Sequence, residues 1–452
     1  MGRLPVGRLP VGRILAVAAV AVVVAGLWQR PALAGGEQVL RDAEIENDIR
    51  TLATPIWRVA GLEPSGVGVY IVNDGQLNSF VAGGQAIFLN SGLILRAQTP
   101  NQLIGVIAHE TGHIAGGHVL RSLEAMKNAG IEQIIAMVAG LGAAIAGGNG
   151  APLVAAAGVG QRAFVQFSVS QEATADHAAL NFLDRSGQSS RGLLQFFEIL
   201  QAGEPLTGEP TDPWARTHPL TIERINYIRH HVETSRYSNA PEPAGFVDLL
   251  KRIKVKLHAF LDDPSATLRA YPESDQSADA RYARAIAYYR IPKLDRALPI
   301  VDGLIRDFPS NPYYRELKGQ MLFENGRVRE AIGPYEQAVK LAPQAPLIRI
   351  SLAQTYVESN DPALNKRAIA YLNDATRVEG REGYVWRLLA TAYGRDNQLG
   401  MAALSLAEEA LANGKKKDAL QQGQRAKQLL KRNTPPYDRA EEIRREAELL
   451  EK

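Results

Sequence analysis

Two histidines one helical turn apart, with a glutamate beside the first, form the sharpest chemical signal in this sequence of 452 residues. They are His109, Glu110 and His113, and they lie in an apolar stretch that predicts a helix from about Pro100 to Ala125. On a helix, residues four apart share a face, so both imidazoles can bind one metal ion. Glu110 lies beside them and is placed to accept a proton from water. This is the spacing of the H-E-x-x-H motif of zinc proteases.

A hydrolytic zinc ion needs a third protein ligand and one position open to water. The extended motif with a third histidine would place it at residue 119, which is a valine, and His118 is one residue short. A downstream carboxylate is the other source. Glu172 and Asp176 lie one turn apart on a helix predicted from about Gln161 to Asp184. We expect Glu172 to be the third ligand and Asp176 to orient a histidine ligand or stabilise the transition state. The competing interpretation is a solvated acidic helix face.

Other chemistries lack their sequence signals. The chain contains no G-x-S-x-G elbow, no P-loop and no EF-hand loop. It has no cysteine, which excludes disulfides, thiol catalysis and cysteine-ligated zinc. The 51 basic and 48 acidic residues give a net charge of only +3, so no strong positive field attracts nucleic acid, and we expect no nucleic-acid partner.

Residues 1–34 have the three parts of a secretory signal peptide. Arginines at positions 3, 8 and 13 precede a short apolar run, Ile14 to Leu27, and Ala32-Leu33-Ala34 supplies a cleavage site. The apolar run is shorter than the roughly 20 residues that span a bilayer. We therefore expect a periplasmic protein, with the alternative that an uncleaved leader anchors it in the inner membrane.

Residues 35–235 mix helical and strand patterns. Val67 to Asn73 and Gln85 to Asn90 are predicted strands, and we expect Gln85–Asn90 to present an edge on which an extended substrate adds as a further strand. The segment 131–160 carries a single charge, Glu132, and a Gly-rich break divides it into two apolar pieces. Each piece is too short to span a bilayer, so we expect helices that lie on a membrane surface or line a groove.

The second half of the chain repeats. Residues 236–277 predict a linker that contains an amphipathic helix, Phe246 to Leu261. In residues 278–452, four windows begin at Ala278, Pro312, Pro346 and Gly383, mostly 34 residues apart. Their eighth position is small, and their twentieth is alanine once a three-residue insertion in the third window is allowed for, which aligns Ala368. The eleventh position is tyrosine in three windows. This is the pattern of tetratricopeptide repeats, which stack as helical hairpins and form an α-solenoid.

A basic cluster lies near the end of the chain. Between Lys415 and Arg432, seven residues are basic and one is acidic. We interpret this cluster as a solvated helix face, with an acidic partner as the alternative.

Three stretches together resemble a known family. They run from Asn78 to Leu93, from His109 to His113, and from Glu172 to Asp176. They are similar to the HtpX/Oma-like gluzincin metalloproteases. With a leader in front and repeats behind, the chain is most similar to the BepA-type branch, whose periplasmic members assist outer-membrane β-barrel assembly. The fold class that follows is mostly α, with a zincin-like α+β metalloprotease domain over 35–235 and an α-solenoid of repeats over 278–452.

The resemblance also implies roles for single residues. One zinc ion per chain lies on His109, His113 and Glu172, Glu110 is the general base, and Asp176 is a proton donor. His218, in Thr217-His218-Pro219, matches a histidine that acts as a displaceable extra zinc ligand and keeps the enzyme latent.

The implied substrates are unfolded or stalled outer-membrane β-barrel proteins, and the repeats recruit them or the β-barrel assembly machinery. Peripheral membrane contact through 131–160 is a further expectation. The alternative function is that of a chaperone-like repeat adaptor with a latent protease domain.

Overall fold

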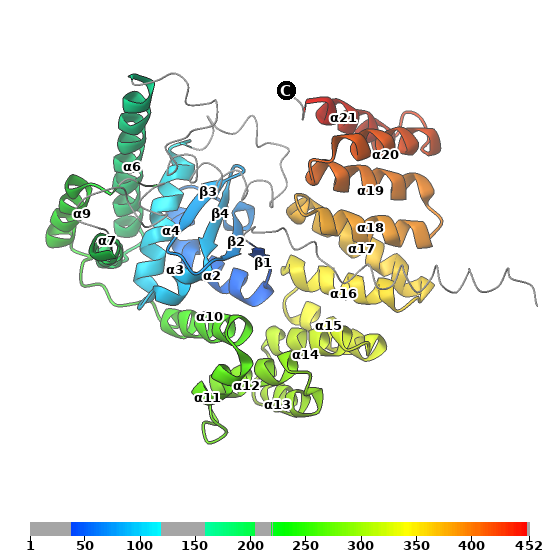
Figure 1. Ribbon diagram of the computed structural model, residues 1–452, viewed down its shortest axis with the longest axis horizontal. Coiled ribbons are helices and arrows are strands. Elements are labelled where there is room, and N and C mark those ends of the chain that lie inside the picture. Colours follow the sequence, from blue (N-terminus) through cyan, green and yellow to red (C-terminus); the bar gives the residue numbers. More distant parts are fainter. Residues whose placement is uncertain (1–37, 119–158, 204–217, 219, 450–452) are drawn as a thin grey trace, which may run out of the picture. The chain divides into compact units, whose positions relative to one another are not determined.

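The computed structural model describes residues 38–118, 159–203, 218 and 220–449 (Figure 1). The predicted leader and most of the apolar segment 131–160 lie outside the described residues. A small sheet contains four strands in the order β1-β2-β4-β3. Strands β2 and β4 are parallel, and the other two pairs are antiparallel. The strand bounds are Gln38–Leu40 for β1, Gly68–Asn73 for β2, Ser79–Ala82 for β3 and Ala86–Asn90 for β4.

The two faces of the sheet are covered differently. Alternate side chains of β2 and β4 point to opposite faces. One set joins the main core together with helices α2 (Ala43–Val59) and α4 (Pro100–Ala115); it contains Val69, Ile71, Ile87 and Leu89. On the other face, the Phe88 ring stacks on the Tyr70 and Phe80 rings, with centroids 5.0 and 4.7 Å away. The sheet therefore holds α4 against one of its faces.

The sequence-based expectation of a substrate edge at Gln85–Asn90 is wrong. Strand β4 lies in the interior of the sheet, hydrogen-bonded to β2 on one side and to β3 on the other. The free edge beside β4 is β3, a strand of four residues that the sequence pattern did not predict, and the edge strand on the other side of the sheet is β1. A tight turn through Gly83 and Gly84, both with positive φ, folds β3 back over β4 and so covers the predicted edge.

Helices α6 (Val159–Arg185) and α7 (Arg191–Gly203) pack against α4, and α9 (Ile222–Thr234) packs against α6 and α7. Helix α4 ends at Ala115, about ten residues before its predicted end, because Gly116 and Gly117 follow and Gly117 takes a φ of +63°. Within the described residues, no helix is long and apolar enough to cross a membrane.

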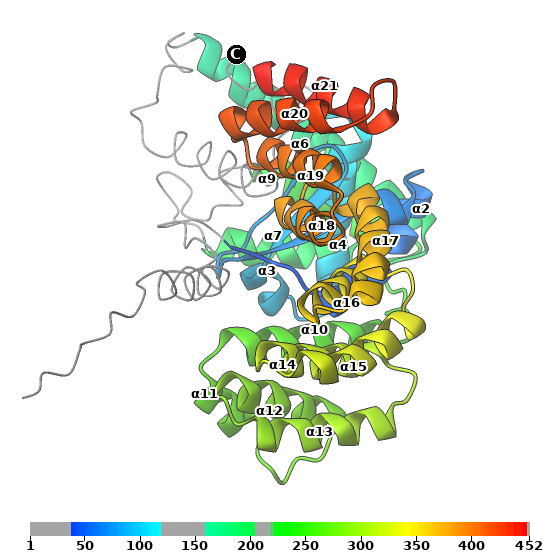
Figure 2. The same ribbon diagram turned by 90° about the vertical axis from the view of Figure 1, so that its right-hand side faces the viewer.

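The repeats fold as the sequence pattern predicts. Each of the four windows begins at the first residue of a helix, and successive helices stack in chain order (Figures 1 and 2). The helix bounds are Ala278–Arg290 (α12), Leu294–Asp307 (α13), Pro312–Glu324 (α14), Val328–Leu341 (α15), Pro346–Glu358 (α16), Pro362–Glu379 (α17), Gly383–Arg395 (α18), Leu399–Ala412 (α19), Lys416–Leu429 (α20) and Pro435–Leu449 (α21).

Small and aromatic repeat positions have the expected packing roles. The alanines at the eighth position, Ala285 and Ala353, are fully buried, as is Tyr356 at the eleventh. Gly319 takes the eighth position in the second window, and a Cβ there would lie 2.7 Å from the Tyr335 ring. The small residues therefore let neighbouring helices approach closely, which is why the repeat tolerates little bulk there.

Helix α10 (Phe246–Leu261), in the region predicted as a linker, contributes to two cores. Leu250 and Leu257 belong to the core that contains the sheet, whereas Val255 and Ala259 belong to the core of the first repeat. Its Lys256 is 3% exposed and lies 2.8 Å from an Asp42 carboxylate oxygen. This helix therefore contributes side chains to both cores.

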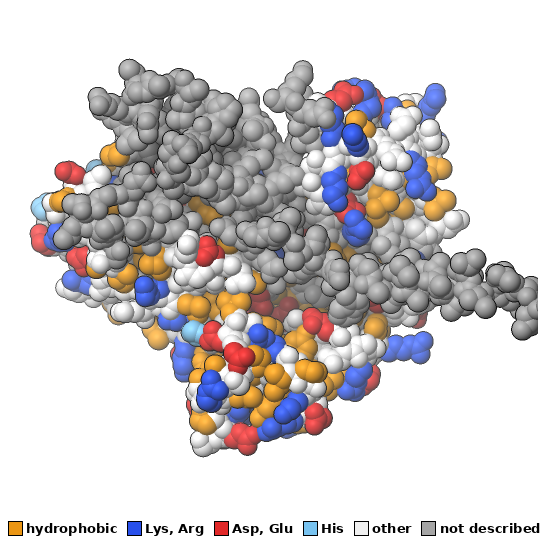
Figure 3. Space-filling model, viewed as in Figure 1, with side chains coloured by type: hydrophobic (Ala, Val, Ile, Leu, Met, Phe, Trp, Pro, Cys, Tyr) orange, Lys and Arg blue, Asp and Glu red, His pale blue; other side chains and the backbone are white. Residues whose placement is uncertain are grey.

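The surface of the last repeats carries charges of both signs. Figure 3 shows basic side chains among acidic ones over α19, α20 and α21. In the basic cluster 415–432, Lys427 pairs with Glu441 of α21. The solvated helix face stays a prediction for this cluster.

Candidate metal centre

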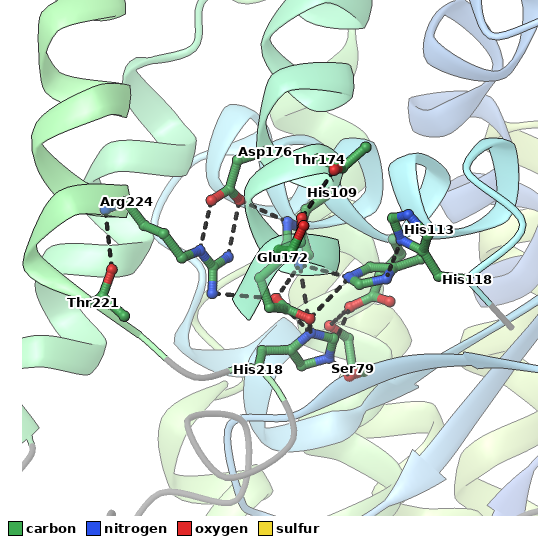
Figure 4. Close-up of polar contacts among 12 residues, drawn as sticks. Ser79, His109, His113, His118, Glu172, Thr174, Asp176, His218, Thr221 and Arg224 are labelled. Carbon is green, nitrogen blue, oxygen red and sulfur yellow. Dashed lines mark hydrogen bonds and ion pairs between the residues drawn. The ribbon is translucent and has the colours of Figure 1, made fainter. Parts of the chain in front are cut away.

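Four potential ligands from three parts of the chain meet in one buried cluster (Figure 4). His109 and His113 come from α4, Glu172 comes from α6, and His218 precedes α9. Their ligand atoms all lie within 4.8 Å of one another. The structure thus brings together the four metal ligands that were expected from the sequence, although they are up to 109 positions apart.

The spacing of these atoms fits a tetrahedral metal ion. His109 Nε2 lies 3.2 Å from His113 Nε2 and 3.3 Å from Glu172 Oε2. His113 Nε2 lies 3.3 Å from Glu172 Oε1, and His218 Nδ1 lies 3.1 Å from Glu172 Oε2 and 3.5 Å from His109 Nε2. Ligands about 2.05 Å from a tetrahedral zinc ion are separated by ~3.3 Å. The donor set, three imidazoles and a carboxylate, is also one that zinc accepts.

The electrostatics of the cluster favour a cation. Burial alone would raise the pKa of Glu172, but His218, His109 and His113 outweigh it and hold that pKa well below its ordinary value. Burial also lowers the pKa of His113. For His109, hydrogen bonds to Asp176 and Glu172 overcome burial and raise the pKa to about 9. The carboxylates thus attract positive charge to the point where the donor atoms converge.

Asp176 lies behind His109 rather than in the cluster. Its Oδ1 accepts a hydrogen bond from His109 Nδ1 at 2.9 Å, which orients the ring with Nε2 toward the other donors. Both carboxylate oxygens also accept hydrogen bonds from Arg224, from Nε at 2.6 Å and from Nη2 at 2.9 Å. Burial raises the pKa of Asp176, but the bonds from Arg224 and His109 reverse this and lower it.

Arg224 is a residue of the site that the sequence analysis missed. It lies in the first turn of α9, is 3% exposed, and its Nη1 also reaches Glu172 Oε2 at 3.2 Å. Its guanidinium carbon lies 5.1 Å from the centre of the Phe197 ring. A single arginine in an amphipathic helix is ordinarily a surface residue, so its type did not mark it as part of the site. The only sequence signal was its position six residues after His218.

Two other side chains support the motif residues. Ser79 Oγ donates a hydrogen bond of 2.6 Å to Glu110 Oε1, and both residues are fully buried. His118 Nδ1 lies 3.1 Å from His113 Nδ1, on the side of the ring opposite the cluster. His118 therefore contacts a predicted ligand from behind, and its own ring is not among the converging donors.

His218 also contacts the edge strand β3. The carbonyl of Asn78 bonds to Asn90 of β4, so the next carbonyl along β3, that of Ser79, points away from the sheet. His218 Nε2 lies 3.3 Å from this Ser79 oxygen. One imidazole thus contacts both the donor cluster, through Nδ1, and the first outward acceptor of the edge strand, through Nε2.

Sequence comparisons agree with this architecture. Residues 40–232 match the profile of peptidase family M48, and residues 265–312 and 282–346 match the tetratricopeptide repeat. The chain is 24% identical to the beta-barrel assembly-enhancing protease of Yersinia pestis, over 75% of this chain and 71% of that protein. The protein of that name from Escherichia coli strain K12 is 23% identical, over 82% of this chain and 77% of its own length. The metalloprotease LoiP of the same strain is 30% identical, over 42% of this chain and 71% of that protein.

Proposed function

Because the chain belongs to peptidase family M48 and is a metalloprotease, we propose that it is a zinc-dependent endopeptidase acting in the quality control of outer-membrane proteins. The observation that carries this proposal is the convergence of His109, His113 and Glu172 at tetrahedral spacing beside Glu110. These three residues would hold one zinc ion per chain. When bound, such an ion polarises the scissile carbonyl and makes water more acidic.

The side chains around the zinc ligands supply the general base and the orientation of a ligand. Glu110 is the general base. Its Oε2 has no hydrogen-bond partner among the described residues, so this oxygen can accept a proton from the attacking water. Asp176 orients His109. This role suits its environment better than that of proton donor, because both of its oxygens accept hydrogen bonds and its pKa is lowered.

His218 keeps the enzyme latent in this proposal. A catalytic zinc site leaves one position open, whereas a site with four protein ligands is closed. His218 Nδ1 lies within 3.5 Å of both His109 Nε2 and the Glu172 carboxylate, so it is placed to fill the fourth position. Activity then requires that His218 leave.

The substrate binds as an extended strand on the free edge of β3 rather than on β4. Main-chain hydrogen bonds along a sheet edge hold a segment with little regard to its sequence. Unfolded or stalled outer-membrane β-barrel chains are rich in segments of this kind, and two relatives are named for β-barrel assembly. Because His218 contacts the outward Ser79 carbonyl, a strand that pairs there competes with His218 for the same acceptor.

We place the protein in the periplasm, delivered by the leader over 1–34, and assign the repeats to recruiting substrates or the β-barrel assembly machinery. Tetratricopeptide arrays offer long surfaces for binding other proteins, which supports this assignment. The competing candidate is a repeat adaptor whose protease domain stays latent, and the contact of His218 with the cluster favours that candidate in the resting state.

The test replaces Glu110 with Gln in the full-length chain. We expect the variant to bind one zinc ion by elemental analysis and to lose about 100- to 10,000-fold in casein cleavage, because the base is gone while the three ligands remain. Undiminished cleavage would refute the endopeptidase mechanism. The same variant separates the two functions in cells: if it fully restores outer-membrane protein assembly to a strain that lacks the gene, the adaptor function dominates.

A further inference from the structure

We propose that Ser79 is a positioning residue for the general base: its hydroxyl holds one oxygen of Glu110 and so directs the other oxygen at the attacking water. This inference rests on the proposed role of Glu110. It adds a residue outside the H-E-x-x-H motif, on the edge strand β3.

The position of Ser79 in the sheet makes a hydroxyl unexpected there. Ser79 pairs with Leu89 across the β3–β4 ladder, and its side chain is on the face that packs against α4. The buried residues of β2 and β4 on this face are apolar: Val69, Ile71, Ile87 and Leu89. A fully buried hydroxyl costs free energy unless it forms a hydrogen bond. Ser79 satisfies this requirement through Glu110.

The contact itself is short and fully buried. Ser79 Oγ lies 2.6 Å from Glu110 Oε1, and both residues have 0% exposure. A hydroxyl that donates to a carboxylate at this distance makes one of the stronger protein hydrogen bonds. His218 Nε2 lies 3.7 Å from the same oxygen, which is beyond hydrogen-bond distance. The other oxygen, Oε2, is buried and has no hydrogen-bond partner among the described residues. The carboxylate is therefore fixed from one side only, by Ser79.

This arrangement separates two roles of β3. Its main chain presents the outward carbonyl on which we propose that substrate pairs, whereas the Ser79 side chain acts on the other component of the reaction, the base. Loss of the hydroxyl leaves the edge intact but lets the Glu110 carboxylate rotate away from the water. Turnover should fall and substrate binding should not.

The experiment compares Ser79→Ala with Ser91→Ala in the full-length chain. Ser91 is a matched control because it is 2% exposed and also donates a hydrogen bond, 3.0 Å long, but to the Asp74 carbonyl. Each variant is made both in the chain that retains His218 and in the chain that carries His218→Ala. A fall in kcat is then visible even if His218 keeps the wild-type site latent. With fluorescent casein, we expect Ser79→Ala to lower kcat roughly ten- to a hundredfold, the range for a hydrogen bond to a charged group. KM and zinc content should stay within twofold, and Ser91→Ala should change neither constant.

A double-mutant cycle tests whether Ser79 acts through Glu110. In Glu110→Asp, the shorter side chain moves the carboxylate away from Ser79, so adding Ser79→Ala should cost less than threefold further. Independent, multiplicative losses would overturn the proposal. A rise in KM at constant kcat would also overturn it, because Ser79 would then act on substrate binding, and loss of zinc would assign it a structural role.

The two proposals fail in different ways. If Glu110→Gln retains full activity, the proposed function fails. If Glu110→Gln is inactive and Ser79→Ala retains the wild-type kcat, the assignment of Ser79 alone fails.

Discussion

Gly112 of α4 lies directly against Ala175 of α6: a Cβ at Gly112 would be 2.6 Å from the Ala175 carbonyl oxygen and 2.9 Å from its Cα. The two helix backbones therefore approach as closely as a glycine allows. Glu172 and Asp176 flank Ala175 on α6, and His109 and His113 flank Gly112 on α4. This close approach brings the two carboxylates to the two histidines.

We expect Gly112→Ala to disrupt the metal site while leaving the helices folded. The added methyl group meets backbone atoms, which cannot rotate away, so α4 and α6 must move apart. Zinc affinity should fall at least tenfold and cleavage should fall with it, as measured by metal competition and casein hydrolysis. Gly333→Ala is the control, since a Cβ at this helical position meets nothing within 4 Å. That variant should be neutral or slightly stabilised. Normal zinc binding by Gly112→Ala would contradict the prediction.

Arg224→Ala should destabilise both the fold and the metal site. It leaves the Asp176 carboxylate buried without its bidentate partner, which costs about 3–5 kcal/mol in unfolding free energy for buried pairs. Because Asp176 orients His109, zinc affinity should also fall by about 10- to 100-fold.

Denaturant unfolding and zinc titration measure the two effects of Arg224→Ala. The matched control is Arg229→Ala on the same helix, whose ion pair with Glu198 is exposed and should contribute less than about 1 kcal/mol. Adding Asp176→Asn to Arg224→Ala should recover part of the stability, because no unpaired charge is then buried. Equal effects of the two arginine variants would argue against a special role for Arg224.

His218→Ala should raise proteolysis several-fold if this histidine fills the fourth zinc position. The three remaining ligands keep the ion, and the vacated position admits water. Casein cleavage and zinc content are measured side by side. His258→Ala serves as the control, because the His258 side chain is 42% exposed and its Nδ1 lies 2.9 Å from the carboxylate of Asp262, four residues along the chain. Unchanged or reduced cleavage with zinc retained would refute the latency proposal.

Asp48→Asn should stabilise the protein at pH 8 but not at pH 4. Asp48 is 3% exposed and its Oδ2 has no hydrogen-bond partner among the described residues. Burial, together with the nearby Glu44, raises its pKa from 3.8 to about 7, against the lowering effect of Arg252 and Lys256. A pKa raised by folding means that the folded chain holds the proton more tightly. Its contribution to stability is complete below about pH 4 and is lost as the pH rises through about 7.

An asparagine at position 48 stays neutral and avoids this loss. The gain at pH 8 should be on the order of 1–3 kcal/mol of unfolding free energy, and urea unfolding across this pH range measures it. Asp374→Asn is the control at an exposed acid, where no such gain should arise. A gain for Asp48→Asn of the same size at every pH would contradict the prediction.

The sequence determined the features that depend on local spacing. A four-residue interval places His109 and His113 on one helix face, and a period of mostly 34 residues indicates where the repeat helices begin, so the metal-binding pair and the repeats followed from pattern alone. Glu172 was expected because a zinc site needs a third ligand and no third histidine stands at the required spacing, whereas the role of His218 came from the resemblance to known metalloproteases.

Tertiary structure decided which strand is the edge and which side chains stand behind the site. Strand β3 covers β4 because a two-glycine turn reverses the chain, and strand order is a property of pairing rather than of any one strand. Ser79 and Arg224 reach Glu110 and Asp176 across 31 and 48 residues of sequence. Such contacts depend on how closely the helices and the sheet pack. Packing of this kind leaves no regular spacing of residues in the sequence, so it cannot be predicted from a pattern.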